Sequence, residues 1–260
     1  IRQYAVRETP KDASSTGTTK DSSSSSPVQH MKTWGKSGHT LPVTEIEFHR
    51  SNIFAATGSV DGSVRVWDVR GAYVTHVFRA VSGGTGGSGT LAVTSVRWLN
   101  DAQQLILAIG RDDGSIVIHN LRHKDASRMP VAVLREHVSA VTCMDWNEKG
   151  NLFVTTGRDA VINLWKVTAS TSKPPKGKKK KQSPTNDVPE YTYQRLHTLP
   201  VYEQLEGMVL LPSHRGPNEL VLATAGSKGQ VRMWKADLAT EGKAPALELM
   251  AEQPKSQSFG

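Results

Sequence analysis

The chain has 260 residues, of which 37% are apolar and 22% are charged, and its formal net charge is +8. No window approaches the ~18 consecutive apolar residues of a membrane span, and no signal peptide is visible. The single cysteine, Cys143, excludes an internal disulfide. This composition indicates a soluble protein of a reducing compartment and excludes the disulfide-rich secreted and membrane-spanning classes.

The first predicted elements are a strand and an insert. Residues 1–6 read Ile-Arg-Gln-Tyr-Ala-Val and have the pattern of a strand, with Tyr4 at a position that a tryptophan occupies further along the chain. Residues 7–28 are rich in Ser, Thr and Lys and have too few apolar residues to form a core, so we expect an insert without structure of its own.

A segment of about 40 residues then recurs along the chain. The first full copy, residues 29–72, contains Gly38-His39, an apolar strand, the turn Ser59-Val60-Asp61-Gly62 and the closing pair Trp67-Asp68. The second, residues 73–122, keeps the turn Asp113 but has His119 at the tryptophan position and Arg111 at the serine position. Because strand alternation and turn residues are retained, we expect the second copy to fold like the first by apolar packing alone.

Two further copies lie on either side of a lysine-rich insert. Residues 130–167 repeat the full pattern with His137, Asp159 and Trp165. Residues 191–236 keep Trp234 but carry Lys228 where the aspartate belongs, so we expect this copy too to rely on apolar packing alone. Residues 246–251 resemble a fourth strand and open the next copy. Between the two copies, residues 168–190 form an insert that contains six lysines: Lys173, Lys176, Lys178, Lys179, Lys180 and Lys181. Without them the net charge is +2, so most of the basicity belongs to this insert.

These repeats resemble the WD-repeat family. The period and the Trp-Asp ending are typical of propeller blades of four strands, so we predict an all-β WD-repeat β-propeller. About four and a half blades can be counted, whereas propellers close with four to eight, and we interpret the chain as a fragment of a larger, seven-bladed propeller. The connection that follows a third strand always emerges on the same face, so both inserts are expected on one side and the Gly-rich residues 82–90 on the other.

The resemblance implies a hydrogen-bonded chain inside each regular blade. In the family the histidine, serine or threonine, aspartate and tryptophan are linked. Here these are His39, Ser59, Asp61 and Trp67 in one blade and His137, Asp159 and Trp165 in another. We interpret them as structural, because a catalytic Ser/His/Asp set needs an exposed nucleophile beside its base.

Other sites are disfavoured by their context. The run Gly84-Thr85-Gly86-Gly87-Ser88-Gly89 matches a dinucleotide-binding fingerprint, but a strand and not a helix follows it. The nine histidines are scattered and none is spaced with the cysteine as in a metal site. We therefore expect no enzyme activity, no cofactor, no metal and no small-molecule substrate.

The last third carries a more specific resemblance. Residues 197–212, with the sequence His-Thr-Leu-Pro-Val-Tyr-Glu-Gln-Leu-Glu-Gly-Met-Val-Leu-Leu-Pro, and residues 222–234 are similar to the transducin beta-like WD-repeat subunits of the UTP-B module of the small-subunit processome. Lys228 in the aspartate position fits that family's version of the blade. The resemblance implies a nucleolar scaffold that contacts sister UTP-B subunits and processome proteins in pre-rRNA processing and 40S assembly.

Two functions stay open from the sequence. The first is the scaffold of ribosome assembly. In that case the six lysines of residues 173–181 either contact the phosphates of pre-ribosomal RNA or snoRNA, or serve as a solubilising or nuclear-localisation segment. The second function is that of a substrate receptor or adaptor of a ubiquitin ligase or signalling complex, in which the propeller recognises a peptide. A neutral mouth lined by aromatic residues or arginine favours peptide recognition, whereas a basic side surface favours the ribosomal role.

Overall fold

A computed structural model describes ten segments of the chain, and all their regular structure is β-strand. The segments are residues 2–6, 28–33, 38–79, 90–99, 105–123, 129–147, 152–170, 190–211, 219–237 and 246–252. Residues 7–27, 171–189 and 82–89 lie outside these segments, so the predicted face of the inserts and of the Gly-rich connection stays a prediction. The predicted bounds of the inserts were too wide, because residue 28 begins β2, residues 168–170 end β13 and residue 190 begins β14. Within the segments no helix is long and apolar enough to cross a membrane.

The chain divides into two compact units, residues 1–39 and residues 40–260. The first contains an antiparallel hairpin of β1 (Arg2–Val6) and β2 (Val28–Thr33), in which Val6 lies opposite Val28. The strand predicted at residues 1–6 is therefore present, and its partner is the segment directly after the Ser/Thr-rich insert. Residues 28–33 complete this hairpin and do not open the copy predicted at residues 29–72.

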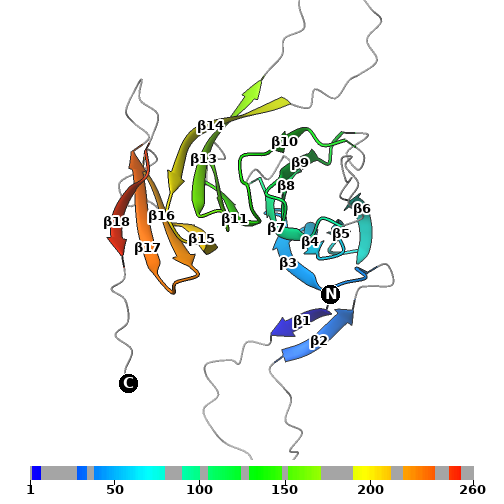
Figure 1. Ribbon diagram of the computed structural model, residues 1–260. Helices are drawn as coiled ribbons and strands as arrows, with labels where there is room; N and C mark the ends of the chain where they lie inside the picture. The colour runs from blue at the N-terminus through cyan, green and yellow to red at the C-terminus, as the bar shows by residue number, and fades with distance from the viewer. Residues whose placement is uncertain are drawn as a thin grey trace, which may run out of the picture. The chain divides into compact units, whose positions relative to one another are not determined.

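The second unit contains four antiparallel sheets of four strands each, as predicted for propeller blades (Figure 1). In every sheet the strands are neighbours in chain order, which is the expected pairing where short turns join them. The bounds are β3 (Val43–Phe48), β4 (Phe54–Ser59), β5 (Ser63–Asp68) and β6 (Tyr73–Arg79); β7 (Val93–Trp98), β8 (Ile106–Arg111), β9 (Ile116–Asn120) and β10 (Ala132–Leu134); β11 (Val141–Trp146), β12 (Leu152–Gly157), β13 (Val161–Ser170) and β14 (Glu190–Pro200); β15 (Leu205–Leu211), β16 (Glu219–Gly226), β17 (Val231–Asp237) and β18 (Glu248–Glu252).

The sheets are offset from the predicted copies by one strand. β6 pairs with β5, although the sequence pattern assigned its residues to the copy at 73–122. β18 likewise completes the last sheet by pairing with β17, although residues 246–251 were expected to open the next copy. The reason is that the recurring Trp-Asp pair ends the third strand, so a repeat defined by that pair ends one strand before its blade does.

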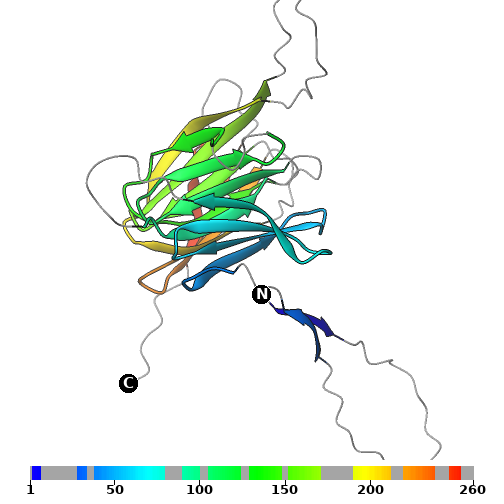
Figure 2. The same cartoon turned by 90° about the vertical axis from the view of Figure 1, so that its right-hand side faces the viewer.

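The first strands of the four sheets are neighbours. β3 contacts β7, β7 contacts β11, and β11 contacts β15. In Figure 1 the labels of these four strands lie along the inner side of the arc formed by the sheets, and Figure 2 shows the sheets from the side. The ends of these strands therefore bring residues from distant parts of the sequence together.

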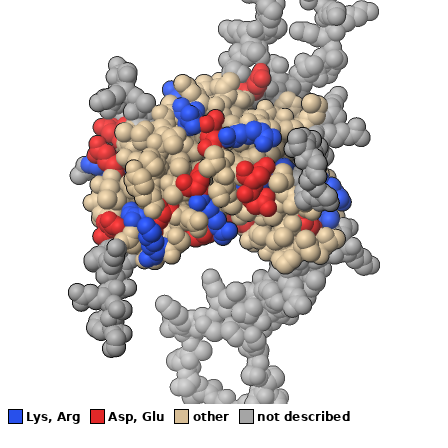
Figure 3. Space-filling view, viewed as in Figure 1, with Lys and Arg blue, Asp and Glu red and all other residues tan. Residues whose placement is uncertain are grey.

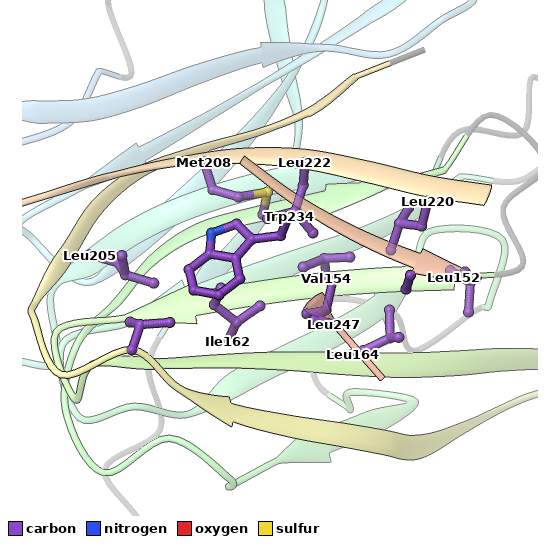
Figure 4. Packing of buried hydrophobic residues seen from close by; sticks show 12 residues of the cluster. Leu152, Val154, Ile162, Leu164, Leu205, Met208, Leu220, Leu222, Trp234 and Leu247 are labelled. Carbon is purple, nitrogen blue, oxygen red and sulfur yellow. The ribbon is translucent and has the colours of Figure 1, made fainter. Parts of the chain in front are cut away.

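Three apolar clusters fill the spaces between successive sheets. The cluster between the last two sheets contains Trp234, whose ring lies among Ile162, Val154, Leu222 and Met208 (Figure 4). β8 serves two clusters, because its alternate residues point to opposite faces: Leu107 and Ile109 pack toward the first sheet and Ile106 and Ala108 toward the third. Burial of both faces explains why β8 reads as a continuous apolar run.

Candidate functional site

The third sheet contains a complete buried network. His137 Nδ1 lies 2.9 Å from Asp159 Oδ2, and His137 Nε2 lies 2.9 Å from Thr155 Oγ1. The Trp165 indole donates to the same Thr155 oxygen at 3.1 Å. Because the carboxylate can only accept, Nδ1 donates, and Nε2 accepts from the threonine hydroxyl. Four side chains from the strand-preceding loop, β12, its turn and β13 are thus fixed relative to one another.

The first sheet corrects one predicted member of its network. The Trp67 indole donates to Thr57 Oγ1 at 2.9 Å and not to Ser59. Ser59 Oγ instead donates to the Leu41 carbonyl at 3.1 Å and accepts from the Asp61 backbone N–H at 3.1 Å. The register of the two strands explains this choice. Ala55 lies opposite Trp67, and Thr57, two residues further along β4, is the next residue on the same face.

Asp61 fixes the turn of the first sheet. Its carboxylate accepts from the backbone N–H of Thr40 at 2.9 Å and from the backbone and side chain of Ser63 at 2.9 and 2.6 Å. His39 belongs to the N-terminal unit, and its place in this network stays a prediction.

A spacing of ten residues identifies the true acceptor in each regular sheet. The indoles of Trp67, Trp165 and Trp234 donate to Thr57, Thr155 and Thr224, each ten residues earlier in the chain. The second copy has Ile109 and His119 at the same spacing, so donor and acceptor are lost together. His119 instead packs against Phe78, with ring centroids 4.2 Å apart. This paired pattern was visible in the sequence but was missed.

The last sheet is not held by apolar packing alone, contrary to expectation. The Glu203 side chain is 1% exposed and forms an ion pair with Arg232, and it accepts from the Lys228 backbone N–H at 3.3 Å. Arg232 also pairs with Glu252 of β18 at 3.1 Å. A Cβ at Gly226 would lie 2.2 Å from the Glu203 carboxyl carbon, so glycine provides the room for this carboxylate. A glutamate therefore performs the task that the sequence pattern assigned to the turn aspartate.

The histidine and aspartate of the third sheet are buried. The side chains of His137 and Asp159 are 0% and 3% exposed. This supports the structural interpretation of these residues. Within the described segments no group of three or more His, Cys, Asp or Glu side chains is arranged to hold a metal ion.

Asp159 makes the stability of this sheet sensitive to acid. Burial disfavours its charged form, but the hydrogen bond from His137 and those from the backbone N–H groups of Val138 and Val161 outweigh this effect and lower its pKa below the ordinary 3.8. A carboxyl with a lowered folded pKa stabilises the fold above its unfolded pKa, and this contribution is lost as the pH falls through the folded value.

We therefore expect the free energy of unfolding of the Asp159→Asn variant to fall less than that of the original chain between about pH 5 and pH 2. The reason is that the variant has no carboxylate at residue 159 to take up a proton on unfolding. Urea unfolding at a series of pH values measures this slope. Asp112→Asn, which removes a carboxylate from an exposed turn, is the control and should leave the slope closer to that of the original chain. Equal slopes in the two variants would contradict the assignment.

The inner strands are joined by polar contacts from blade to blade. The Thr44 hydroxyl donates to the Val93 carbonyl at 2.9 Å, and the Thr94 hydroxyl donates to the Val141 carbonyl at 2.6 Å. Glu45 accepts from the Val96 backbone N–H at 2.5 Å, and burial raises the pKa of this carboxyl. We call these contacts, together with those of Arg97 below, the inter-blade seam.

A pocket of about 270 Å³ lies where β3, β7 and β11 end. Arg97 crosses it, donating to Glu47 at 2.9 Å and to the Met144 carbonyl at 2.7 Å, with Asp145 at 3.6 Å. Burial opposes the charge of Arg97, but the two carboxylates raise its pKa. The lining residues are Glu47, Phe48, Arg50, Arg97, Trp98, Leu99, Asp145 and Trp146. This pocket was not predicted from the sequence, because its residues come from three different sheets.

The described surface carries both signs of charge. Figure 3 shows Lys and Arg interspersed with Asp and Glu on one face, without a large patch of one sign among the described residues. Exposed ion pairs such as Arg158 with Glu206, at 2.9 Å, contribute to this mixture. The six lysines of residues 173–181 lie outside the described segments, between the ends of β13 and β14.

Comparison with known proteins decides the family. The model of the family described as "WD domain, G-beta repeat" matches residues 29–68 and 128–166. The chain belongs to the WD-repeat family. The matched residues include β3 to β5, β10 to β12 and the first part of β13, and with them the networks of Trp67 and Trp165; the network of Trp234 lies outside the matched residues.

The similarity extends beyond the matched repeats. Transducin beta-like protein 3 of Mus musculus is 31% identical over 207 residues, which is 77% of this chain and 22% of that protein. The ribosome biogenesis protein WDR12 homolog of Arabidopsis thaliana is 25% identical over 193 residues, 71% of this chain and 41% of that protein. Cell division cycle 20.6, cofactor of APC complex, also of Arabidopsis thaliana, is 29% identical over 133 residues, 51% of this chain and 28% of that protein. The chain thus spans about a fifth of the transducin beta-like relative.

Proposed function

We propose that this WD-repeat chain is a non-catalytic scaffold in ribosome biogenesis. The observation that carries the proposal is the 31% identity to Transducin beta-like protein 3 over 77% of the chain, together with the likeness to a protein named for ribosome biogenesis. The blades suit this role, because buried networks and three apolar clusters make a rigid body whose loops and strand ends can hold partners.

The finer proposal is that the chain serves in the UTP-B module of the small-subunit processome in the nucleolus. Its partners there would be sister WD-repeat subunits, processome proteins and pre-ribosomal RNA or snoRNA. The motif in residues 197–212 supports this assignment; these residues include the end of β14, the connection that follows it and all of β15. Glu203, the buried acid of the last sheet, lies within this motif, so the motif is explained in part by folding and in part by family descent.

Affinity purification of the tagged full-length protein from nuclear extract, before and after nuclease treatment, tests the proposal. We expect UTP-B sister subunits and pre-ribosomal RNA to co-purify, with the subunits retained after nuclease because protein contacts hold them. Recovery of ubiquitin-ligase or signalling components without ribosomal RNA would overturn the ribosomal assignment and leave the WD-repeat fold unaffected.

The lysine-rich insert is proposed as the RNA contact. A run of Lys, Pro and Gly binds phosphates without reading sequence, and each contact on single-stranded RNA contributes roughly 0.7 to the slope of log affinity against log salt. Replacing Lys173, Lys176, Lys178, Lys179, Lys180 and Lys181 by serine should lower that slope by up to about 4. Binding of the purified protein to a pre-rRNA transcript at several salt concentrations measures it.

The matched control replaces the same six residues by arginine, which keeps the charge and should keep the slope. If the serine variant binds RNA as the unmodified chain does, the insert is not the RNA contact. If in addition the serine variant is excluded from the nucleus, the insert is a localisation signal.

The second candidate is an adaptor that recognises a peptide, as expected of a ubiquitin-ligase substrate receptor. The similarity to an APC cofactor and the aromatic, charge-balanced pocket favour it. The purification separates the two functions, since an adaptor retains its ligase partners and has no reason to retain pre-ribosomal RNA.

A further inference from the structure

An aromatic residue ends each of three successive inner strands. Phe48, Trp98 and Trp146 are the last residues of β3, β7 and β11, and all three line the pocket described above. Trp98 and Trp146 are each 4% exposed, whereas Phe48 is 51% exposed. The pocket therefore has one apolar wall that is open to contact from outside and two that belong to the core.

One of the two buried tryptophans in the pocket wall carries a hydrogen-bond donor without an acceptor among the described residues. The Trp98 indole donates to the Glu47 carbonyl of the neighbouring strand at 3.2 Å. Trp146 occupies the equivalent position of the next strand and stacks on Phe153, with ring centroids 4.0 Å apart. Its buried indole nitrogen has no hydrogen-bond partner within the described part of the protein. A buried donor of this kind is costly unless it is satisfied.

The charges in the pocket leave one cation available. Arg97 is neutralised by Glu47 at 2.9 Å and Asp145 at 3.6 Å. Arg50 is exposed at the rim, and no carboxylate of the described segments pairs with it. Arg50 can balance one negative charge, whereas the further charges of a phosphate chain would be repelled by the acidic side chains of Glu47 and Asp145. A ligand that combines an apolar side chain with a single carboxylate matches this arrangement.

We propose that this pocket docks an extended segment of a partner protein that carries an apolar side chain next to an Asp or Glu. The apolar side chain packs on Phe48, and the carboxylate meets Arg50. Aromatic and arginine side chains are the residues that dominate protein interfaces, which is consistent with this use. The proposal holds whichever assembly contains the protein, so its failure would not affect the ribosomal function.

The test is selection from a phage-displayed library of random peptides against the intact chain, followed by affinity measurement of the selected peptides. We expect peptides with an aromatic or aliphatic residue beside an acidic one. Phe48→Ala and Arg50→Glu should each weaken their binding roughly tenfold or more, as loss of an interface anchor does. In a ¹H–¹⁵N spectrum the Trp146 indole signal, assigned with Trp146→Phe, should shift when the peptide is added.

Tyr73→Ala and Arg79→Glu are the matched controls, because both remove exposed side chains of the same kinds from β6, outside the pocket. Both should bind the peptides as the original chain does. Selected peptides whose affinity is unchanged by Phe48→Ala and Arg50→Glu would overturn the proposal, as would a library that yields no binder. Displacement of the selected peptide by a single-stranded RNA that binds more tightly through Phe48 would also overturn it and assign the pocket to RNA.

Discussion

Replacing Gly114 by alanine is expected to lower the free energy of unfolding by roughly 3 kcal/mol or more, because strain and a backbone clash act together. Gly114 has a φ of +83° in the turn between β8 and β9. A Cβ there would lie 2.3 Å from the His137 carbonyl oxygen and 2.9 Å from the Ser139 carbonyl oxygen. Both are backbone atoms of the loop that precedes β11, so the clash forces two blades apart. Urea unfolding followed by tryptophan fluorescence measures the change.

Gly229 provides a matched control for this prediction. It has a φ of +73° in the equivalent turn of the last sheet, but a Cβ there would meet no atom within 4 Å. Gly229→Ala should therefore cost about 1 kcal/mol, the penalty for a left-handed backbone alone. If the two substitutions cost the same, the close approach between the blades does not contribute to stability.

Replacing His137 by alanine is expected to lower the free energy of unfolding by about 3 kcal/mol, because the buried Asp159 and Thr155 lose their common partner. His197→Ala is the control, since it removes a half-buried histidine from β14 of the same sheet. The control should cost well under half as much.

A double-mutant cycle provides a second measurement. His137→Ala and Asp159→Ala should not be additive, because either substitution alone already breaks the contact between the two side chains. The double variant should cost little more than His137→Ala. Additive costs would show that histidine and aspartate stabilise the sheet independently.

The blade fold was predictable because it depends on local signals. Alternating strands, turn residues such as Asp61-Gly62 and a period of about 40 residues are all written in contiguous sequence. The same signals predicted the strand at residues 1–6, which is β1 of the hairpin, and the strand at residues 246–251, which corresponds to β18. Blade boundaries were offset only because the conspicuous Trp-Asp pair belongs to the third strand and not to the last.

Side-chain partners were harder to predict, because they depend on register across strands. Thr57 and Ser59 both face the same side, and the sequence alone did not show which one meets the Trp67 indole. Glu203 was missed as a structural residue because it lies in a loop, outside the strands and the turn from which the pattern was defined. The pocket could not be foreseen at all, since Phe48, Trp98 and Trp146 are about 50 residues apart in the sequence and meet only through blade packing.

The inter-blade seam has a mechanical consequence. Thr44, Thr94 and Arg97 each bond the backbone of the following inner strand, so a force that slides one blade along its neighbour must break several short bonds at once. Bonds loaded together in shear resist far better than bonds opened one after another. A partner that pulls on the strand ends would therefore move these blades as one body, and tension arising in an assembly would reach the connecting segments before it separated the sheets.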